Sequence, residues 1–117
     1  MSSANDFYES GNCALAIGEL AEAEGEFRKA TLADPHYFDA WHALGMVLYK
    51  QNKYPEAIEA GLKAVAIEPN DQMGWTSLSI AYMRNGQVPE AEDASAKAKV
   101  ISWGGKVDKM QKEETKP

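Results

Sequence analysis

The chain is poor in the residues that most often carry out chemistry in proteins. Its 117 residues include one cysteine, Cys13, and two histidines, and no His-x-x-x-His or Cys-x-x-Cys spacing occurs. A disulfide within the chain is therefore excluded, and a metal site is disfavoured. We expect Cys13 to be a small buried residue rather than a nucleophile.

Sequence signatures of enzymes are also missing. No glycine-rich phosphate loop follows a strand-like segment, and no serine lies in the pattern of a nucleophile elbow. The neighbouring acidic residues Glu22 with Glu24, and Glu90 with Glu92, are better explained as solvated helix faces than as catalytic pairs. The sequence predicts a protein that is not an enzyme and that needs no cofactor.

Basic residues and long apolar runs are scarce as well. The chain has 12 basic and 18 acidic residues, a net charge of −6, and its basic residues are scattered, which disfavours nucleic acid as a partner. No apolar run approaches the ~20 residues that cross a membrane, so we expect no membrane insertion. The N-terminal "MSSANDFYESGN" resembles neither a secretory signal nor a mitochondrial presequence. We expect a cytoplasmic protein.

The chain does contain an internal repeat. Aromatic residues recur every 34 residues at Phe7, Trp41 and Trp75. The same spacing links glutamates, alanines and prolines: Glu22, Glu56, Glu90; Ala23, Ala57, Ala91; Ala30, Ala64, Ala98; and Pro35, Pro69. Trp103 stands where the next proline would fall. A fixed period of this length is typical of a stacked-repeat fold.

Each repeat is predicted to form two helices. In the middle one, helical apolar spacing covers 38–50 and 54–67, with a break between them. Gly18, Asn52 and Gly86 occupy equivalent positions in the three breaks, and these residue types readily take the left-handed conformation that ends a helix. Pro55 and Pro89 then fit the first turn of the next helix. Three hairpins are expected, over about 4–34, 37–68 and 71–102.

The pattern resembles that of the tetratricopeptide repeat (TPR) family. In the middle unit six of eight characteristic positions carry the expected residue, with Leu48 and Gly61 in place of aromatics: Trp41, Leu44, Gly45, Leu48, Ala57, Gly61, Ala64 and Pro69. The resemblance implies an all-α, right-handed superhelix of three antiparallel helix-turn-helix repeats within 1–103, the units being about 4–37, 38–71 and 72–103. Residues 104–117 would form a charged tail, as a short capping turn or disordered.

The resemblance also implies a groove lined by the first helix of each repeat. In the middle unit Trp41, Leu44, Gly45 and Leu48 share one side of the helix and are expected to pack. A second side, roughly a quarter-turn or more away, gives the expected peptide-binding residues Tyr8, Asn12, Asp39, His42, Met46, Tyr49, Met73, Thr76, Ile80 and Met83, with Lys50 and Arg84 at the groove edge. For several of these residues the alternative role is to pack in the core. For Ile80, and for Leu15 on the same side of the first repeat, core packing and groove contact are equally open.

The sequence thus favours a non-catalytic protein-binding module, an adaptor or scaffold that holds a peptide or helix of a partner. One TPR subclass binds acidic chaperone C-termini through Lys, Asn, Asn, Lys and Arg. The aligned residues here are Tyr8, Asn12, Ala43, Met73 and Ser77. Since a buried carboxylate needs cationic donors and only Asn12 fits, we expect no such partner.

The ends of the solenoid suggest the alternative function. Terminal repeats need polar outer faces, and Glu24 and Glu92 flank the apolar Ile58 at one repeated position. The last repeat has little to cover it, and Val100, Ile101 and Trp103 lie near its end. The alternative is a self-associating structural scaffold, a homodimer formed through this poorly capped C-terminal repeat.

Overall fold

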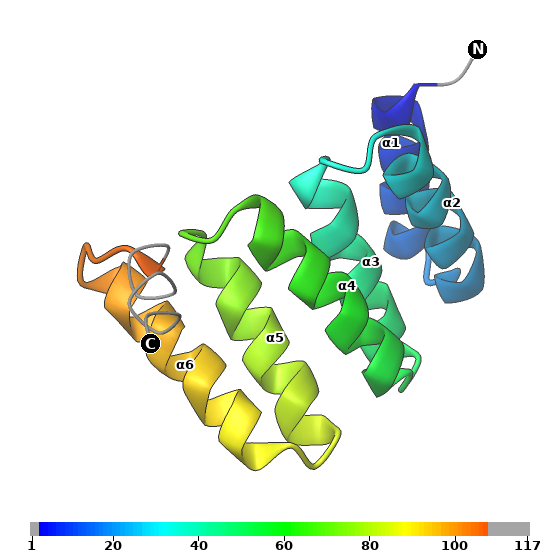
Figure 1. Cartoon of the computed structure of the whole chain (residues 1–117). Coiled ribbons are helices and arrows are strands. Elements are labelled where there is room, and N and C mark those ends of the chain that lie inside the picture. Colours follow the sequence, from blue (N-terminus) through cyan, green and yellow to red (C-terminus); the bar gives the residue numbers. More distant parts are fainter. Residues whose placement is uncertain (1–2, 108–117) are drawn as a thin grey trace.

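A computed structural model describes residues 3–107 of the chain. This part contains six α-helices and no strand: α1 (Ala4–Ala16), α2 (Leu20–Ala33), α3 (Phe38–Lys50), α4 (Tyr54–Ile67), α5 (Gln72–Arg84) and α6 (Val88–Ser102). The helices follow one another as three antiparallel hairpins stacked side by side (Figure 1). The all-α class and the three predicted hairpins are confirmed, and the middle hairpin has the predicted helix bounds.

The three turns within the hairpins are built alike. Gly18, Asn52 and Gly86 have φ angles of 81°, 65° and 80°, which confirms the predicted left-handed positions. In each turn the next residue donates its backbone N–H to a carbonyl five residues back, as from Lys53 to Leu48 at 2.9 Å. This bond is characteristic of a Schellman helix end. Proline occupies the first turn of both α4 and α6, as predicted.

Adjacent hairpins pack through α2 against α3 and through α4 against α5. The indole Nε1 of Trp41 donates to the Pro35 carbonyl at 2.9 Å, and that of Trp75 donates to the Pro69 carbonyl at 2.7 Å. Each tryptophan therefore holds the loop that precedes its own helix. These two bonds give a physical reason why tryptophan recurs at this position.

The column of small residues acts differently in each repeat. A Cβ added to Gly11 would lie 2.5 Å from the ring of Phe27, which is fully buried. A Cβ on Gly45 would meet nothing closer than 3.5 Å. In the third repeat the hydroxyl of Ser79 donates to the Ala91 carbonyl at 2.8 Å. Close approach thus requires glycine only in the first repeat.

Cys13 is exposed, so the prediction that it is buried is wrong. The buried residues of α1 are Gly11 and Ala14. They lie one turn apart, and Cys13 is rotated by about 100° from Ala14 and about 200° from Gly11. Its position therefore faces away from the core, a difference that the apolar character of cysteine did not reveal.

Glu24 is not a solvated residue, which corrects a second prediction. Its carboxylate accepts hydrogen bonds from Gln51 at 2.8 Å and from Lys53 at 3.0 Å, and from Arg28 on its own helix at 2.8 Å. Burial alone would raise the pKa of Glu24, but these donors outweigh burial and lower that pKa from its ordinary 4.5 to about 2. Glu24 therefore joins the first repeat to the turn of the second.

At the C-terminal end, Val107 is fully buried and its N–H donates to Asn70 Oδ1 in the α4–α5 loop at 2.8 Å. Trp103, at the end of α6, is 79% exposed. Most of the expected tail over 104–117 lies outside the described residues, and the predicted unit boundaries remain a prediction. No helix within 3–107 is long and apolar enough to cross a membrane.

Candidate functional site

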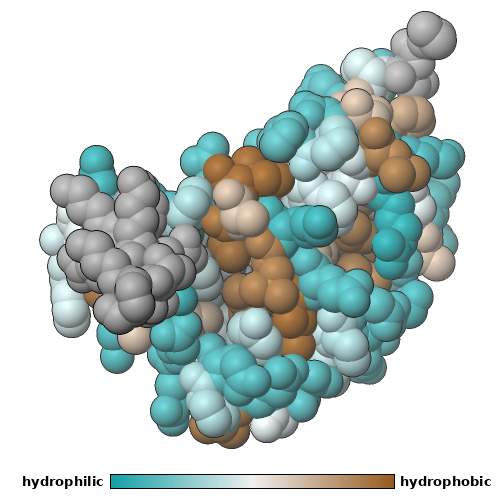
Figure 2. Space-filling model, viewed as in Figure 1, coloured by the Kyte–Doolittle hydropathy of each residue, from teal (hydrophilic) through white to brown (hydrophobic). Residues whose placement is uncertain are grey.

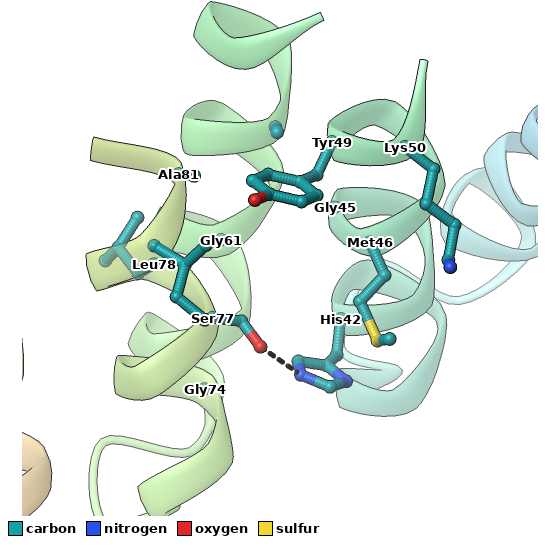
Figure 3. A pocket seen from close by; sticks show the side chains of 12 residues that line it. His42, Gly45, Met46, Tyr49, Lys50, Gly61, Gly74, Ser77, Leu78 and Ala81 are labelled. Atoms are coloured by element: carbon teal, nitrogen blue, oxygen red, sulfur yellow. Dashed lines mark hydrogen bonds between the residues drawn. The ribbon is translucent and has the colours of Figure 1, made fainter. Parts of the chain in front are cut away.

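An apolar pocket of about 210 Å³ lies between α3 and α5 and is closed behind by α4 (Figure 3). We call the side of the molecule formed by α1, α3 and α5 the groove face. The pocket is lined by residues of all three helices α3, α4 and α5: His42, Gly45, Met46, Tyr49, Lys50, Ala57, Gly61, Gly74, Ser77, Leu78, Ile80 and Ala81. Two neighbouring repeats therefore build it together.

One end of the pocket is closed by a hydrogen bond between repeats. His42 Nε2 and Ser77 Oγ lie 3.0 Å apart, which bridges α3 to α5 (Figure 3). The His42 ring is also stacked on Phe38, with centroids 5.7 Å apart and planes 11° from parallel. Packing on one side and a hydrogen bond on the other fix the imidazole, and the two polar groups satisfy each other.

Tyr49 limits the other end, where its ring lies across the gap between α3 and α5 (Figure 3). The Tyr49 ring contacts Tyr54 at a centroid distance of 5.6 Å, and the Arg84 guanidinium carbon lies 5.9 Å from its centroid. Met46 and Ile80, 40% and 47% exposed, stand on the two walls. The pocket is thus open to solvent between a methionine and an isoleucine.

The pocket exists because small residues occupy the positions behind it. Gly61 corresponds to Phe27 of the first repeat, one 34-residue period earlier. There the Phe27 ring fills the space against Gly11 and contacts Tyr8 at a centroid distance of 5.8 Å. In the second repeat Leu78 approaches Gly61 but leaves the space beside it open.

The structure brings five of the twelve predicted groove residues into the pocket: His42, Met46, Tyr49, Ile80 and Lys50. The others lie elsewhere on α1, α3 and α5. Asn12, Asp39, Thr76, Met73 and Met83 are exposed outside its lining, with Met73 at 65% and Met83 at 51%. Arg84 lies over the Tyr49 ring.

Tyr8 belongs to a separate aromatic cluster at the first junction. It packs partly buried against the core and contacts Tyr37 at a centroid distance of 5.2 Å. The Tyr37 hydroxyl donates to Asn5 Oδ1 at 3.1 Å. Burial, helped by nearby Tyr8 and acidic groups, raises the pKa of Tyr37 above its usual 10.0.

Sequence reasoning missed Ser77 and the small residues of the floor as part of a pocket. His42 and Ser77 are separated by 35 residues, one more than the repeat. That spacing places them on facing helices of adjacent repeats and was the available signal. Gly61 was visible as a departure from the aromatic pattern, but the departure alone does not reveal whether neighbours fill the space.

Two wider crevices are built from more strongly charged residues. The first crevice, of about 710 Å³, is lined by residues of α4, α5 and α6, among them Glu90, Asp93 and Lys97. The second, of about 580 Å³, includes Arg28 and Glu59. Lys97 lies 4.8 Å from the centroid of Trp75 and pairs with Asp93 at 2.9 Å. Figure 2 shows hydrophobic surface as a band where α4 and α5 lie in Figure 1, with hydrophilic surface on both sides.

The groove face offers no arrangement for metal chemistry within the part of the chain that the structure describes. Over residues 3–107 no group of three or more His, Cys, Asp and Glu side chains could hold a metal ion. The polar groups of the pocket are one imidazole, two hydroxyls and one ammonium, and the rest of its lining is apolar or small. This arrangement suits contact with an apolar group.

Stacked helical hairpins with equivalent turns and a shared core define a solenoid of helical repeats. The chain belongs to the tetratricopeptide repeat family, whose profile matches residues 4–72. The predicted family is therefore confirmed. No curated protein matches the chain.

Solved structures agree with this fold. The chain is similar to the crystal structure of MamA, with 28% identity and a TM-score of 0.84 over 87% of this chain and 60% of that one. It resembles the CopN–Scc3 complex structure, with 23% identity and a TM-score of 0.83 over 95% and 65% of the two chains. The second TPR of Spaghetti (RPAP3), bound to the HSP90 peptide SRMEEVD, has 18% identity and a TM-score of 0.81 over 86% and 93%. This chain spans 60% of the length of that MamA chain and 54% of a second MamA chain, to which it is 29% identical.

Proposed function

We propose that this protein is a non-catalytic, cytoplasmic adaptor that binds a peptide or helix of a partner protein on its groove face. The observation that carries this proposal is the apolar pocket between α3 and α5, open between Met46 and Ile80. Methionine adapts its shape to a ligand, and tyrosine offers a large rigid surface with a polar tip. A groove face needed only for folding would gain nothing from keeping these side chains exposed.

Further support comes from the proteins of similar fold. Two TPR units of Spaghetti (RPAP3) are solved with a bound HSP90 peptide, and another neighbour is solved as the CopN–Scc3 complex. These facts concern those proteins. They make protein binding the best-supported class of function for a TPR solenoid that has an open apolar pocket between repeats.

The acidic chaperone peptide itself is not the ligand that we propose. Among the aligned clamp positions, Ala43 and Met73 carry no donor, and the hydroxyl of Ser77 is already bonded to His42. A titration with the peptide SRMEEVD should therefore show no affinity in the micromolar range, because the terminal carboxylate of the peptide finds no clamp. A dissociation constant in the micromolar range would contradict this prediction.

The direct experiment begins with a partner captured from the native cells. Its affinity is then measured for the wild type and for a variant carrying Tyr49→Ala and Met83→Ala. Both residues are on the groove face, and we expect a loss of about tenfold or more. Gly25→Ala on α2, where an added Cβ meets nothing within 4 Å, is the control. An unchanged affinity in the double variant would show that the groove face is not the site.

The second candidate function is self-association through the last repeat, which is favoured by the exposure of Trp103 at the end of α6. A dimer would bury this ring. Light scattering over a dilution series discriminates the two functions, because a mass that stays at one chain up to high concentration removes the self-associating scaffold.

A further inference from the structure

We propose that the pocket between α3 and α5 takes one apolar side chain of the partner peptide, and that an acidic residue next to it pairs with Lys50 and Arg84. The inference rests on the proposed peptide-binding function and specifies the chemistry of the ligand. Two independent features carry it: the lining of the pocket and the position of the charges at its mouth.

The walls that a guest would meet are mainly apolar. His42 Nε2 and Ser77 Oγ already share a hydrogen bond, and Met46, Leu78 and Ile80 form apolar walls. A polar guest would lose its hydrogen bonds to water without replacing them, whereas an apolar side chain loses nothing. The volume of about 210 Å³ is below the ~300–1,000 Å³ of small-molecule sites, so a side chain fits it better than a whole cofactor.

The charges at the mouth are positive although the chain as a whole has a net charge of −6. Lys50 lines the pocket and follows Tyr49 in the chain, while Arg84 lies over the Tyr49 ring. In the described part of the chain, four other cations pair with acidic residues: Arg28, Lys29, Lys53 and Lys97. Lys50 and Arg84 are exposed and make no ion pair within residues 3–107, so each is available to a carboxylate of the ligand.

The two features coincide only at the junction of the second and third repeats. At the first junction Phe27 fills the equivalent space, and the residues at the positions of Lys50 and Arg84 are Ala16 and Lys50. A filled space with one cation offers neither the hole nor the paired charge. Within residues 3–107 the structure therefore provides one such anchor site.

Nuclear magnetic resonance of the full chain tests this chemistry with defined probes. The capped peptide acetyl-Gly-Leu-Glu-Gly-amide is added while amide shifts are recorded. We expect saturable shifts at Gly45, Gly61, Gly74 and Ser77. Replacing the leucine of the probe by alanine should weaken binding about tenfold, and replacing its glutamate by lysine about threefold. Shifts that fail to saturate, or that arise mainly outside these residues, would overturn the inference.

Charge reversal separates the acidic preference from a general effect of charge. In the double variant Lys50→Glu with Arg84→Glu, we expect the lysine-containing probe to bind more tightly than the glutamate-containing one. The control Lys63→Glu changes an exposed lysine of α4 outside the pocket and should leave the original order intact. If the double variant still prefers glutamate, the pairing with Lys50 and Arg84 is wrong.

Failure here is distinguishable from failure of the proposed function. If the probes do not bind but the captured partner loses affinity in the Tyr49→Ala and Met83→Ala variant, the anchor chemistry is wrong and groove binding stands. If the partner is also indifferent to that variant, both the anchor and the groove proposal are overturned.

Discussion

The first and second junctions between repeats follow the same 34-residue register but have different residue types at equivalent positions. At the first, Phe27 fills the space behind the groove face and Glu24 bonds to Gln51 and Lys53 of the next repeat. At the second, Gly61 replaces the phenylalanine and the buried Ile58 replaces the glutamate. Behind the groove face the first junction is filled by a ring, and a charged side chain links its two repeats. At the second junction the space is open, and the position of that charged side chain is apolar.

This difference shows how one repeat pattern supplies both stability and binding. A large ring in the interior stabilises a fold through the apolar surface that it buries. Omitting the ring at one junction leaves a pocket between helices that neighbouring contacts still hold in place. The predictions that follow separate the two junctions, from the largest expected effect to the smallest.

The largest contrast is between Phe27 and Gly61. Phe27→Ala should lower the free energy of unfolding by about 3–5 kcal/mol, because it leaves a cavity at the first junction. Gly61→Ala should change it by less than about 1 kcal/mol, because better helix propensity offsets a small shift of Leu78, 3.0 Å from the added Cβ. Urea unfolding measures both. Similar losses in the two variants would mean that the second junction is as tightly filled as the first.

A glycine pair tests the close packing of the first repeat. Gly11→Ala should cost about 1–2 kcal/mol, since the new methyl group meets the buried Phe27 ring. Gly25→Ala, on the neighbouring helix with open space around it, should instead stabilise by about 0.5–1 kcal/mol. Thermal and urea unfolding of the two variants should move in opposite directions. Stabilisation by Gly11→Ala would contradict the packing that we describe.

The polar link of the first junction should depend on pH. The pKa of Glu24 is lowered in the folded chain to about 2, so its contribution is present above its ordinary 4.5 and is lost as the pH falls towards about 2. Arg28 and Lys53 are 48% and 42% exposed, and solvent screening limits the contribution to about 1 kcal/mol.

Comparison with Glu24→Gln separates the contribution of Glu24 to the free energy of unfolding from that of the other carboxylates. The variant should be less stable than the wild type at neutral pH, and the difference should shrink between about pH 4.5 and pH 2. A difference that stays constant over this range would show that the charge of Glu24 does not link the repeats.

Much of the fold follows from sequence because it repeats. Gly18, Asn52 and Gly86 are local signals, and three copies in register predict the turns and hence the helices. The partners of Glu24 are not local: Gln51 and Lys53 reach it only once two repeats stack, so an acidic helix residue looked solvated. Cys13 illustrates the same limit, since residue type does not reveal which side of a helix faces inward.

The site was predictable only in part for a related reason. Helical angles place His42, Met46 and Tyr49 on one side of α3, and the structure puts all three in the pocket. A pocket, however, is the space that side chains leave unfilled. Whether Gly61 leaves a hole depends on how far Leu78 and the backbone of α3 move towards it, which no single helix encodes.

The most direct test of the account compares two exposed apolar residues, Met46 of α3 and Leu62 of α4. Met46 stands at the mouth of the pocket, whereas Leu62, 45% exposed, lines the wider crevices instead. We predict that Met46→Asp lowers the affinity for the captured partner about tenfold or more, because the new carboxylate would be buried by the apolar side chain of the ligand and repelled by its acidic residue. Leu62→Asp should leave the affinity unchanged. An affinity lost in Leu62→Asp and kept in Met46→Asp would contradict the account.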